Sequence, residues 1–247
     1  MIKNGEIFDF LCEKYPLDSA ADFDNPGFLI GDKDDMTEKV IVSLDCDITA
    51  VKEAVKTGSK LIITHHPVIF DPLKSVTAGS VVYEAIKNGI SVISMHTNLD
   101  IAEGGVNDCL CEALGLTDVK PYIAEDGFTL RSGKTDADAD SFAKIIKENL
   151  GYSVRYTGSG KIEKLLVCSG SGCDYMDEAI KNGFDGLIAA DSKQRHFIKA
   201  INNGFALFDC GHFASENVVI KPLCRLLSEK FRTAEFIPYS HGLIKFA

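Results

Sequence analysis

Short apolar runs alternate with amphipathic stretches along the first half of the chain. Three runs, at residues 39–44, 61–64 and 90–95, are short, rich in β-branched residues and bounded by polar turn residues, which predicts buried strands. Between them, apolar residues recur at helical spacing and predict helices at residues 48–56 and 81–87. A strand–helix–strand–helix–strand rhythm is typical of a mostly parallel sheet with right-handed crossovers. The pattern therefore predicts an α/β fold.

The same rhythm returns in the second half. It predicts strands and helices in alternation, at residues 164–167, 175–181, 186–189, 197–201 and 205–208. A shift of 125 residues aligns residues 39–63 with residues 164–188 without a gap, and seven of these 25 positions are identical. Any two amphipathic strand–helix units resemble each other, but here the register holds through strand, helix and turn. We therefore favour an internal duplication and expect two similar α/β halves with mostly parallel sheets.

A polar stretch at residues 124–140 separates the two halves. It contains a short predicted strand at residues 128–131, and a helix at residues 141–150 follows, with Ser141 as its expected N-cap. We place the boundary near this stretch, with a first α/β domain at residues 1–123 and a second at residues 124–247. The segment from about residue 211 to residue 247 is expected to contribute ligands to the first domain and to pack on it.

Composition narrows the class of protein. The net charge of −10, with no clustered basic stretch, argues against nucleic-acid binding, which needs Lys and Arg on one face. No apolar run has the length of a membrane span, and the first residues do not resemble a signal peptide. The eight cysteines are dispersed, which is typical of reduced thiols. These features predict a cytoplasmic protein without a membrane partner.

Three polar clusters follow predicted strands and carry the candidate chemistry. They are Thr64-His65-His66-Pro67, His96-Thr97-Asn98-Leu99-Asp100 and Gly211-His212-Phe213-Ala214-Ser215-Glu216. In open α/β sheets, sites form beyond the carboxyl ends of the strands. A pair of histidines alone is equally consistent with a polar loop, but four histidines and two carboxylates at equivalent sheet edges suit Zn, Mn, Fe or Ni. Adjacent histidines point in different directions, which favours two metal ions over one.

Two further features of the sequence have alternative explanations. The turn Ser169-Gly170-Ser171-Gly172 lies between a strand and a helix, where backbone N–H groups can bind a phosphate. A tight strand-to-helix turn explains the same residues equally well. At the equivalent place in the first half, Asp45 and Asp47 are expected to cap a helix.

Together, four motifs resemble the NGG-interacting-factor-three family, also known as dinuclear metal centre hexameric proteins or GTP cyclohydrolase I type 2 homologues. They are Asp24-Asn25-Pro26-Gly27-Phe28-Leu29-Ile30-Gly31, Thr64-His65-His66-Pro67, His96-Thr97-Asn98-Leu99-Asp100 with Gly105-Val106-Asn107-Asp108, and Gly211-His212 with Ser215-Glu216. The resemblance covers essentially the whole chain. It implies that the metal ligands are His65, His66, Asp100, His212 and Glu216.

The resemblance also implies two divalent metal ions per chain (Zn, Fe, Mn or Ni) and a toroidal homohexamer of the family's short form, without an inserted third domain. The chain departs from the family pattern at Phe23, where tryptophan is usual, at Ala190, where glycine is frequent, and at Arg195, where a histidine is frequent. His96 and Asp191 are the candidates for a general acid or base beside the ligands.

Three classes of function are compatible with such a site. The first is a metal-dependent hydrolase, similar to a GTP cyclohydrolase, that acts on a nucleotide or another phosphorylated small molecule. Two divalent cations bring four positive charges and the ligands Asp100 and Glu216 return two negative ones, so an anionic substrate is expected. The alternatives are a non-catalytic metal-handling or metal-insertion protein and a protein-interaction scaffold, because fold and metal site do not determine the reaction.

Overall fold

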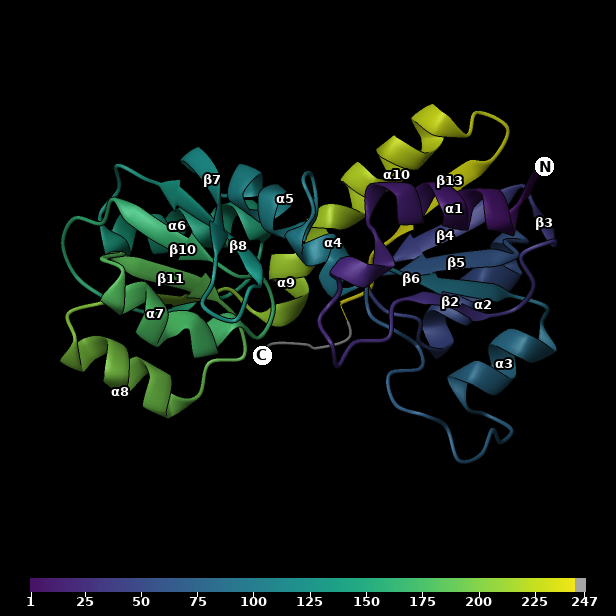
Figure 1. Cartoon of the computed structure of the whole chain (residues 1–247), viewed down its shortest axis with the longest axis horizontal. Helices are drawn as coiled ribbons and strands as arrows, with labels where there is room; N and C mark the ends of the chain where they lie inside the picture. The colour runs from purple at the N-terminus through teal and green to yellow at the C-terminus, as the bar shows by residue number, and fades with distance from the viewer. Residues whose placement is uncertain (243–247) are drawn as a thin grey trace. The chain divides into compact units, whose positions relative to one another are not determined.

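The computed structural model describes residues 1–242 of the chain, which form two compact units. The first unit contains residues 1–102 together with the chain from Ile220 onward, and the second contains Glu103–Val219. In Figure 1 the first unit is drawn from purple to blue, with the yellow elements α10 and β13 returning to it. No helix within residues 1–242 is long and apolar enough to cross a membrane.

The division of the chain differs from the boundary that we expected at residues 123 and 124. Strand β7 (Thr117–Ile123) pairs antiparallel with β8 (Thr129–Lys134), and both belong to the sheet of the second unit. The polar stretch after residue 124 is therefore the turn of a hairpin followed by its second strand, and the units divide after Ala102. We interpreted the polar composition of this stretch as that of a linker between domains, but it belongs to a hairpin turn. Both kinds of segment are polar because both are exposed to water.

The first unit is built on a five-stranded sheet with the order β13-β4-β5-β6-β2. Its strands are β13 (Glu235–Tyr239), β4 (Lys39–Ser43), β5 (Leu61–Thr64), β6 (Ser91–Ser94) and β2 (Gly27–Ile30). The first four are mutually parallel and β2 runs antiparallel to β6. β13 belongs to the segment after about residue 211 that we expected to pack on the first domain, although no strand was predicted within it.

Helices α2 (Ile48–Thr57) and α3 (Val81–Lys87) pack on one face of this sheet. Asp47 caps α2 by accepting a hydrogen bond from the backbone N–H of Ala50, and Gly58 ends it in the left-handed region, with φ of 75°. The buried side chains Val51 and Ala54 meet the central strands from this side. Alternate strand residues facing the other way are also fully buried, as a parallel sheet covered on both faces requires.

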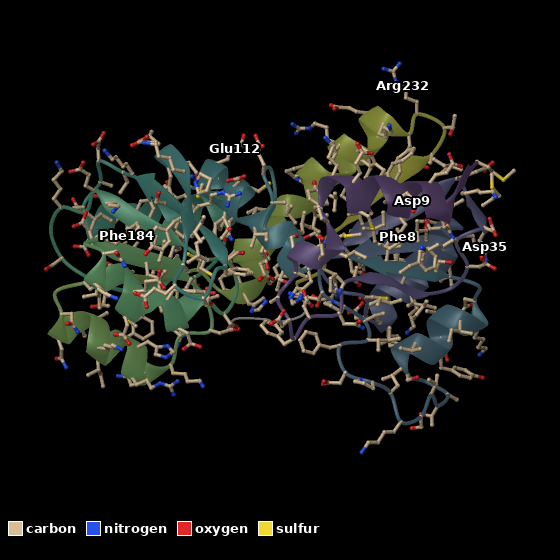
Figure 2. The ribbon with its side chains drawn as sticks, in the orientation of Figure 1. Phe8, Asp9, Asp35, Glu112, Phe184 and Arg232 are labelled. Atoms are coloured by element: carbon tan, nitrogen blue, oxygen red, sulfur yellow. The ribbon has the colours of Figure 1, made fainter. Side chains whose placement is uncertain are left out.

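Further elements complete the first unit. They are β1 (Ile2–Lys3), α1 (Asn4–Lys14), the 3₁₀ helix η1 (Leu17–Ser19), β3 (Met36–Thr37), α4 (Thr97–Ile101) and α10 (Ile220–Lys230). On α1, Phe8 packs edge-to-face against Phe28 of β2, with ring centroids 5.7 Å apart (Figure 2). Asn4 donates a hydrogen bond to the buried Ser91 hydroxyl at 3.1 Å, which joins the start of α1 to β6.

The second unit is built on a six-stranded sheet with the order β7-β8-β10-β11-β12-β9. Its remaining strands are β10 (Lys164–Val167), β11 (Gly186–Ala189), β12 (Ala206–Asp209) and β9 (Arg155–Thr157). The central strands β10, β11 and β12 are parallel, while β8 and β9 flank them antiparallel. The predicted α/β fold is thus confirmed, and the parallel centre of this sheet is narrower than that of the first.

Two apolar cores cover the two faces of the second sheet, because successive strand residues point to opposite sides. Leu165 and Val167 belong to the core under α6 (Ala139–Leu150) and α5 (Val106–Ala113). Leu166 belongs to the core under α7 (Met176–Lys181) and α8 (Gln194–Asn202). The remaining elements are the 3₁₀ helices η2 (Gly172–Tyr175) and η3 (Asn217–Val219), and α9 (His212–Glu216). Asp138, and not Ser141, is the N-cap of α6.

The observed elements agree with the register on which we based the proposed duplication. β11 begins 125 residues after β5, and each strand is four residues long and fully buried. Further along the chain, β6 and β12, followed by α4 and α9, correspond at a different shift, of 115 residues. Each unit therefore has a strand that leads into a five-residue helix carrying candidate ligands. This correspondence is what a duplication would leave, and the duplication remains our proposal.

Candidate metal centre

In the first unit, the candidate ligands lie at the carboxyl ends of two neighbouring parallel strands. His65 and His66 follow β5, and His96 follows β6. The ring nitrogens that these three histidines offer to a metal lie within 4.8 Å of one another. The sheet places them there because β5 and β6 are paired in register, with Thr64 opposite Ser94 at their ends. Parallel pairing thus brings residues 30 positions apart into one cluster.

The backbone that carries the two adjacent histidines is held by buried hydroxyl groups. Thr64 donates to the carbonyl oxygen of His66 at 2.8 Å, and Ser94 donates to the same oxygen at 3.3 Å. The backbone N–H of His65 donates to the carbonyl oxygen of Ser43, at the end of β4, and the backbone N–H of His66 donates to that of Leu44, just after it. Thr64 and Ser94 are fully buried. The two rings are therefore presented from a rigid strand end and not from a loose loop.

Each of these three histidines has its Nδ1 atom on an oxygen acceptor. His65 Nδ1 lies 3.0 Å from the Met95 carbonyl oxygen. His66 Nδ1 lies 2.7 Å from Asp45 Oδ1, and His96 Nδ1 lies 2.7 Å from Asp24 Oδ1. A carbonyl or carboxylate oxygen can only accept, so Nδ1 carries the proton. In a neutral ring the lone pair is then on Nε2, as it is in histidines that bind metals.

Asp100 brings a carboxylate to the same cluster from helix α4. Its Oδ1 lies 3.5 Å from His65 Nε2, and both residues are more than nine-tenths buried. The helix is anchored by Asn98, which accepts from the His96 backbone N–H at 2.9 Å and donates to the Tyr15 carbonyl at 2.8 Å. Asp100 is consequently held where its carboxylate faces the His65 ring.

Asp24 is a buried carboxylate whose partners keep it ionised. It accepts from His96 Nδ1 and, through Oδ2, from the Thr97 backbone N–H at 3.0 Å and hydroxyl at 2.5 Å. Burial raises the pKa of Asp24, but the hydrogen bonds from His96 and Thr97 outweigh it and lower the pKa to about 2. Asp24 therefore stays charged near neutral pH and orients the His96 ring.

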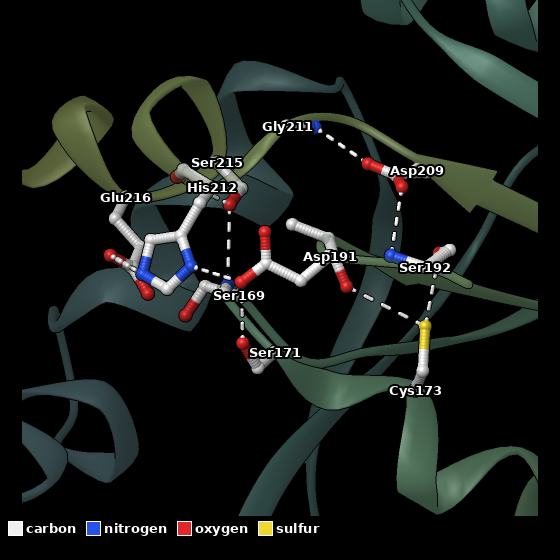
Figure 3. A network of polar contacts seen from close by, with 12 residues as sticks. Ser169, Ser171, Cys173, Asp191, Ser192, Asp209, Gly211, His212, Ser215 and Glu216 are labelled. Carbon is white, nitrogen blue, oxygen red and sulfur yellow. Dashed lines mark hydrogen bonds and ion pairs between the residues drawn. The ribbon is translucent and has the colours of Figure 1, made fainter. Parts of the chain in front are cut away.

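In the second unit, His212 and Glu216 lie four residues apart on α9, with His212 Nε2 3.0 Å from Glu216 Oε2. His212 Nδ1 lies 2.8 Å from Asp191 Oδ2, which also accepts from the Ser171 hydroxyl at 2.6 Å (Figure 3). Asp191 has a positive φ of 54°, which is uncommon for a residue with a side chain. The backbone after β11 is thus held so that this carboxylate meets the His212 ring.

The acid–base state of His212 follows from these contacts. Burial lowers the pKa of His212, but hydrogen bonds and negative charge from Glu216 and Asp191 overcome this effect and raise the pKa to about 9. Burial raises the pKa of Asp191, and the hydrogen bonds from Ser171 and His212 more than offset it, so the pKa lies below its usual value. A metal ion at His212 would therefore take the place of a proton.

Two glycines leave room for these side chains. A Cβ atom on Gly170 would lie 2.2 Å from Glu216 Oε1, and φ at Gly170 is +60°. A Cβ atom on Gly211, the N-cap of α9, would lie 2.1 Å from the Tyr152 ring, and φ there is +75°. Only glycine combines this backbone conformation with such close contacts. The turn at residues 169–172 and the start of α9 are therefore shaped around Glu216 and His212.

Three backbone N–H groups of the turn Ser169–Gly172, which we predicted as a phosphate site, have acceptors within the chain. Ser169 donates to Asn107 Oδ1 at 2.8 Å, Gly170 donates to the Ser215 hydroxyl at 3.2 Å, and Gly172 donates to the Gly170 carbonyl at 2.8 Å. The first two bonds connect the turn to α5 and α9. The phosphate site remains a prediction, and the contacts favour the alternative of a packing turn.

The donor atoms fit a divalent metal ion. Metal–nitrogen and metal–oxygen bonds of about 2.0–2.2 Å place two ligands of one ion roughly 3–3.5 Å apart. The separation of 3.5 Å between His65 Nε2 and Asp100 Oδ1 lies in this range, and so does the 3.0 Å between His212 Nε2 and Glu216 Oε2. Imidazole and carboxylate ligands suit Zn, Fe, Mn and Ni. Each unit therefore carries a histidine–carboxylate pair with the chemistry and spacing of a metal site.

The site residues predicted from the sequence form one cluster in each unit. His65, His66 and Asp100 lie together in the first unit with His96, and His212 and Glu216 lie together in the second with Asp191. Sequence reasoning missed the roles of Asp24 and Asp45. Asp47 caps α2 as expected, but Asp45 contacts the His66 ring. The signal available for Asp24 was its place in the Asp24-Asn25-Pro26-Gly27 motif, to which we had assigned no role.

Known proteins provide an independent comparison. A family model described as Duf34/NIF3 (NGG1p interacting factor 3) matches residues 2–241. The protein named GTP cyclohydrolase 1 type 2 homolog from Clostridium perfringens is 32% identical over 251 residues, covering 96% of this chain and 95% of the relative. The crystal structure of Staphylococcus aureus hypothetical protein SA1388 aligns with a TM-score of 0.90 and 27% identity, over 99% of this chain and 98% of that one.

Reduced HcgD from Methanocaldococcus jannaschii also has the same fold, with a TM-score of 0.85 and 28% identity over 97% of this chain and 98% of that one. The family model spans both units and every motif on which the resemblance was based. The resemblance inferred from those motifs is therefore confirmed, and the chain belongs to the Duf34/NIF3 family.

Proposed function

We propose that His65, His66, Asp100, His212 and Glu216 bind two divalent metal ions, and that the protein is a metal-dependent hydrolase acting on a nucleotide or another phosphorylated small molecule. The observation that carries the proposal is the state of the histidines. His65, His66 and His212 each have Nδ1 on an oxygen acceptor, which directs Nε2 toward a ligand-binding position. The name of the relative from Clostridium perfringens, GTP cyclohydrolase 1 type 2 homolog, supports a hydrolytic reaction on a nucleotide.

The chemistry divides between the metals and the chain. Divalent ions held by these ligands would supply the Lewis acidity that hydrolysis near neutral pH needs. The chain orients the ligand rings through Asp45, Asp191 and the Met95 carbonyl, which also raises their basicity as ligands. His96 is not among the proposed ligands. Its ring is held by Asp24 beside the rings of His65 and His66, where it can donate a hydrogen bond to a bound substrate or accept one from it.

Charge at the site is more evenly balanced than the five ligands alone suggest. We expected two positive charges in excess, from two divalent cations against Asp100 and Glu216. Asp24, Asp45 and Asp191 add three carboxylates that contact histidines of the two clusters. The summed electrostatic field of these charges therefore gives little attraction for an anion. A phosphorylated substrate would instead be held by direct contact with the cations, with further binding energy from its uncharged parts.

The family resemblance also leads us to propose a homohexamer. Closed rings of identical chains with dihedral symmetry are a common form of soluble oligomer. Light scattering of the purified protein should then report about six times the 26.9 kDa of one chain. A mass near that of the single chain would contradict the proposal.

Metal content gives the first test of the ligands. Protein purified without chelator and supplied with Zn, Mn or Fe should contain about two metal ions per chain. We expect His65→Ala, Asp100→Ala and Glu216→Gln to lose one or both ions, because each removes a ligand atom from a histidine–carboxylate cluster. His241→Ala, which changes an exposed histidine near the end of the described chain, is the matched control and should retain both. Metal content near zero in the wild type would refute the site.

The raised pKa of His212 predicts how binding depends on pH. Histidine binds metal only as the neutral ring, and with a pKa of about 9 the His212 ring is protonated at neutral pH. Metal binding at pH 7 should therefore release about one proton from His212, and affinity should increase as the pH rises toward 9. Calorimetry in buffers of different ionisation enthalpy measures the released proton, and His212→Ala should abolish it. Affinity that is unchanged between roughly pH 8 and 5 would indicate carboxylate ligands alone.

Turnover is the test of the hydrolase itself. The protein loaded with its native metal should hydrolyse GTP or a member of a phosphoester panel. Glu216→Gln keeps the size of the side chain and removes its charge, so it should reduce the rate at least tenfold, whereas His241→Ala should not. Bound metal with no turnover on any substrate, or turnover that is unchanged in Glu216→Gln, would favour the metal-handling protein or the interaction scaffold.

A further inference from the structure

Two phenylalanine rings are exposed beside the histidines of the first unit. Phe23 is 69% exposed and Phe70 is 45% exposed, although large apolar side chains are normally buried. Their ring centroids lie 6.4 Å apart with the planes tilted by 43°. Phe70 also lies 6.2 Å from the His96 ring, in an edge-to-face arrangement of 82°. The two rings thus form an open aromatic surface, here called the Phe23–Phe70 surface, that leads to His96.

This surface is attached to the candidate metal centre by hydrogen bonds within the same unit. Asp24, which follows Phe23, holds His96 Nδ1 at 2.7 Å. Asn25 donates to the carbonyl oxygen of Ile69, the residue before Phe70, at 2.7 Å. The segments that carry the two rings are therefore joined to each other and to His96. The His96 ring in turn lies 5.0 Å from the His65 ring and 5.6 Å from the His66 ring.

The chemistry of the surface indicates what it would bind. A phenyl ring gains most from a planar π-system that stacks on its face, and heteroaromatic bases do so while their polar edges remain in water. The proposed substrate needs such a contact, because the carboxylates around the histidines leave little net charge to attract an anion. A group bound on Phe23 and Phe70 would place the rest of the molecule toward His96 and the predicted ligands.

We propose that the Phe23–Phe70 surface binds a planar heteroaromatic ring of the substrate, by stacking, next to the metal centre. This inference rests on the proposed function and narrows its substrate to molecules that carry such a ring, such as a nucleobase. An exposed aromatic pair could also be covered by a second copy of the chain. The position beside His96 favours the substrate, and the experiment separates the two.

The first experiment uses fluorescence of the metal-loaded protein. The chain contains no tryptophan, so Phe23→Trp introduces a single indole on the surface. We expect saturable quenching by GTP and by guanosine, which carry the ring, and none by ribose 5-phosphate or inorganic phosphate, which lack it. Ile86→Trp on α3, at a position that is 58% exposed, is the control and should show only weak, unsaturable quenching. Quenching that is equal in the two variants, or saturable with phosphate alone, would overturn the proposal.

The second experiment separates this inference from the hydrolase. Phe23→Ala and Phe70→Ala should weaken guanosine binding by about five- to a hundredfold, the range measured for loss of one stacking contact, while metal content stays at the wild-type value. If turnover fails but the saturable quenching persists, the ring site stands and the reaction is wrong. If turnover persists in both variants with unchanged KM, the ring site is wrong. An emission of the Phe23→Trp variant that shifts with protein concentration, without any effect of guanosine, would show that a second copy covers the surface.

Discussion

The hydrogen bond from Nδ1 of a histidine to an oxygen acceptor is the interaction on which the candidate centre depends. It recurs at His65, His66, His96 and His212, with a carbonyl at the first and a carboxylate at each of the others. A free imidazole rotates and exchanges between two tautomers, so four independent rings would seldom present Nε2 in the required directions. A hydrogen bond from Nδ1 to an oxygen that can only accept fixes both the orientation of the ring and its tautomer. Among these acceptors, Asp24 must remain charged although its side chain is buried, whereas the side chains of Asp45 and Asp191 are in contact with solvent.

Hydrogen bonds from neighbouring residues stabilise the charged carboxylates of Asp24 and Asp191. The Asp24 carboxylate receives two hydrogen bonds from Thr97 in addition to the one from His96, and Asp191 receives one from Ser171. Such bonds replace the water that a buried carboxylate loses, which is why the pKa of each lies below its usual value despite burial. The same carboxylates reduce the positive field of any bound cations.

The fold explains why these groups occur where they do. Paired parallel strands end at the same edge, so the residues that follow β5 and β6 become neighbours although 30 positions separate them. In each unit the last strand of the parallel centre leads directly into a helix of five residues, α4 or α9, which brings a carboxylate to a histidine. Glycine is required only where the chain passes closest to these side chains, as at Gly170 and Gly211. A repeated strand-to-helix junction is therefore the structural unit of the site.

The sequence by itself determined the α/β class, the central strands and the family, because apolar periodicity and short motifs are local properties. It also identified the candidate ligands, all of which come directly after strands or from the short helices that follow them. It could not place the domain division, because the strand predicted at residues 128–131 gave no sign that it pairs with β7, and this pairing puts both strands in the second unit. It predicted no strand at residues 235–239, because the place of β13 beside β4 depends on pairing between segments that are far apart in the chain.

Only the tertiary structure assigned Asp45 to His66 and Asp24 to His96, since these pairs are 21 and 72 residues apart and leave no periodic signal. Asp45 is the clearest case. Beside Asp47, at the start of a helix, a capping role is the expected local explanation, and Asp47 has it. The direction of the Asp45 side chain is set by the parallel pairing of β4 and β5, which brings His66 within hydrogen-bonding distance. Local sequence determines which groups are present at the site, and the pairing of distant strands decides which of them meet.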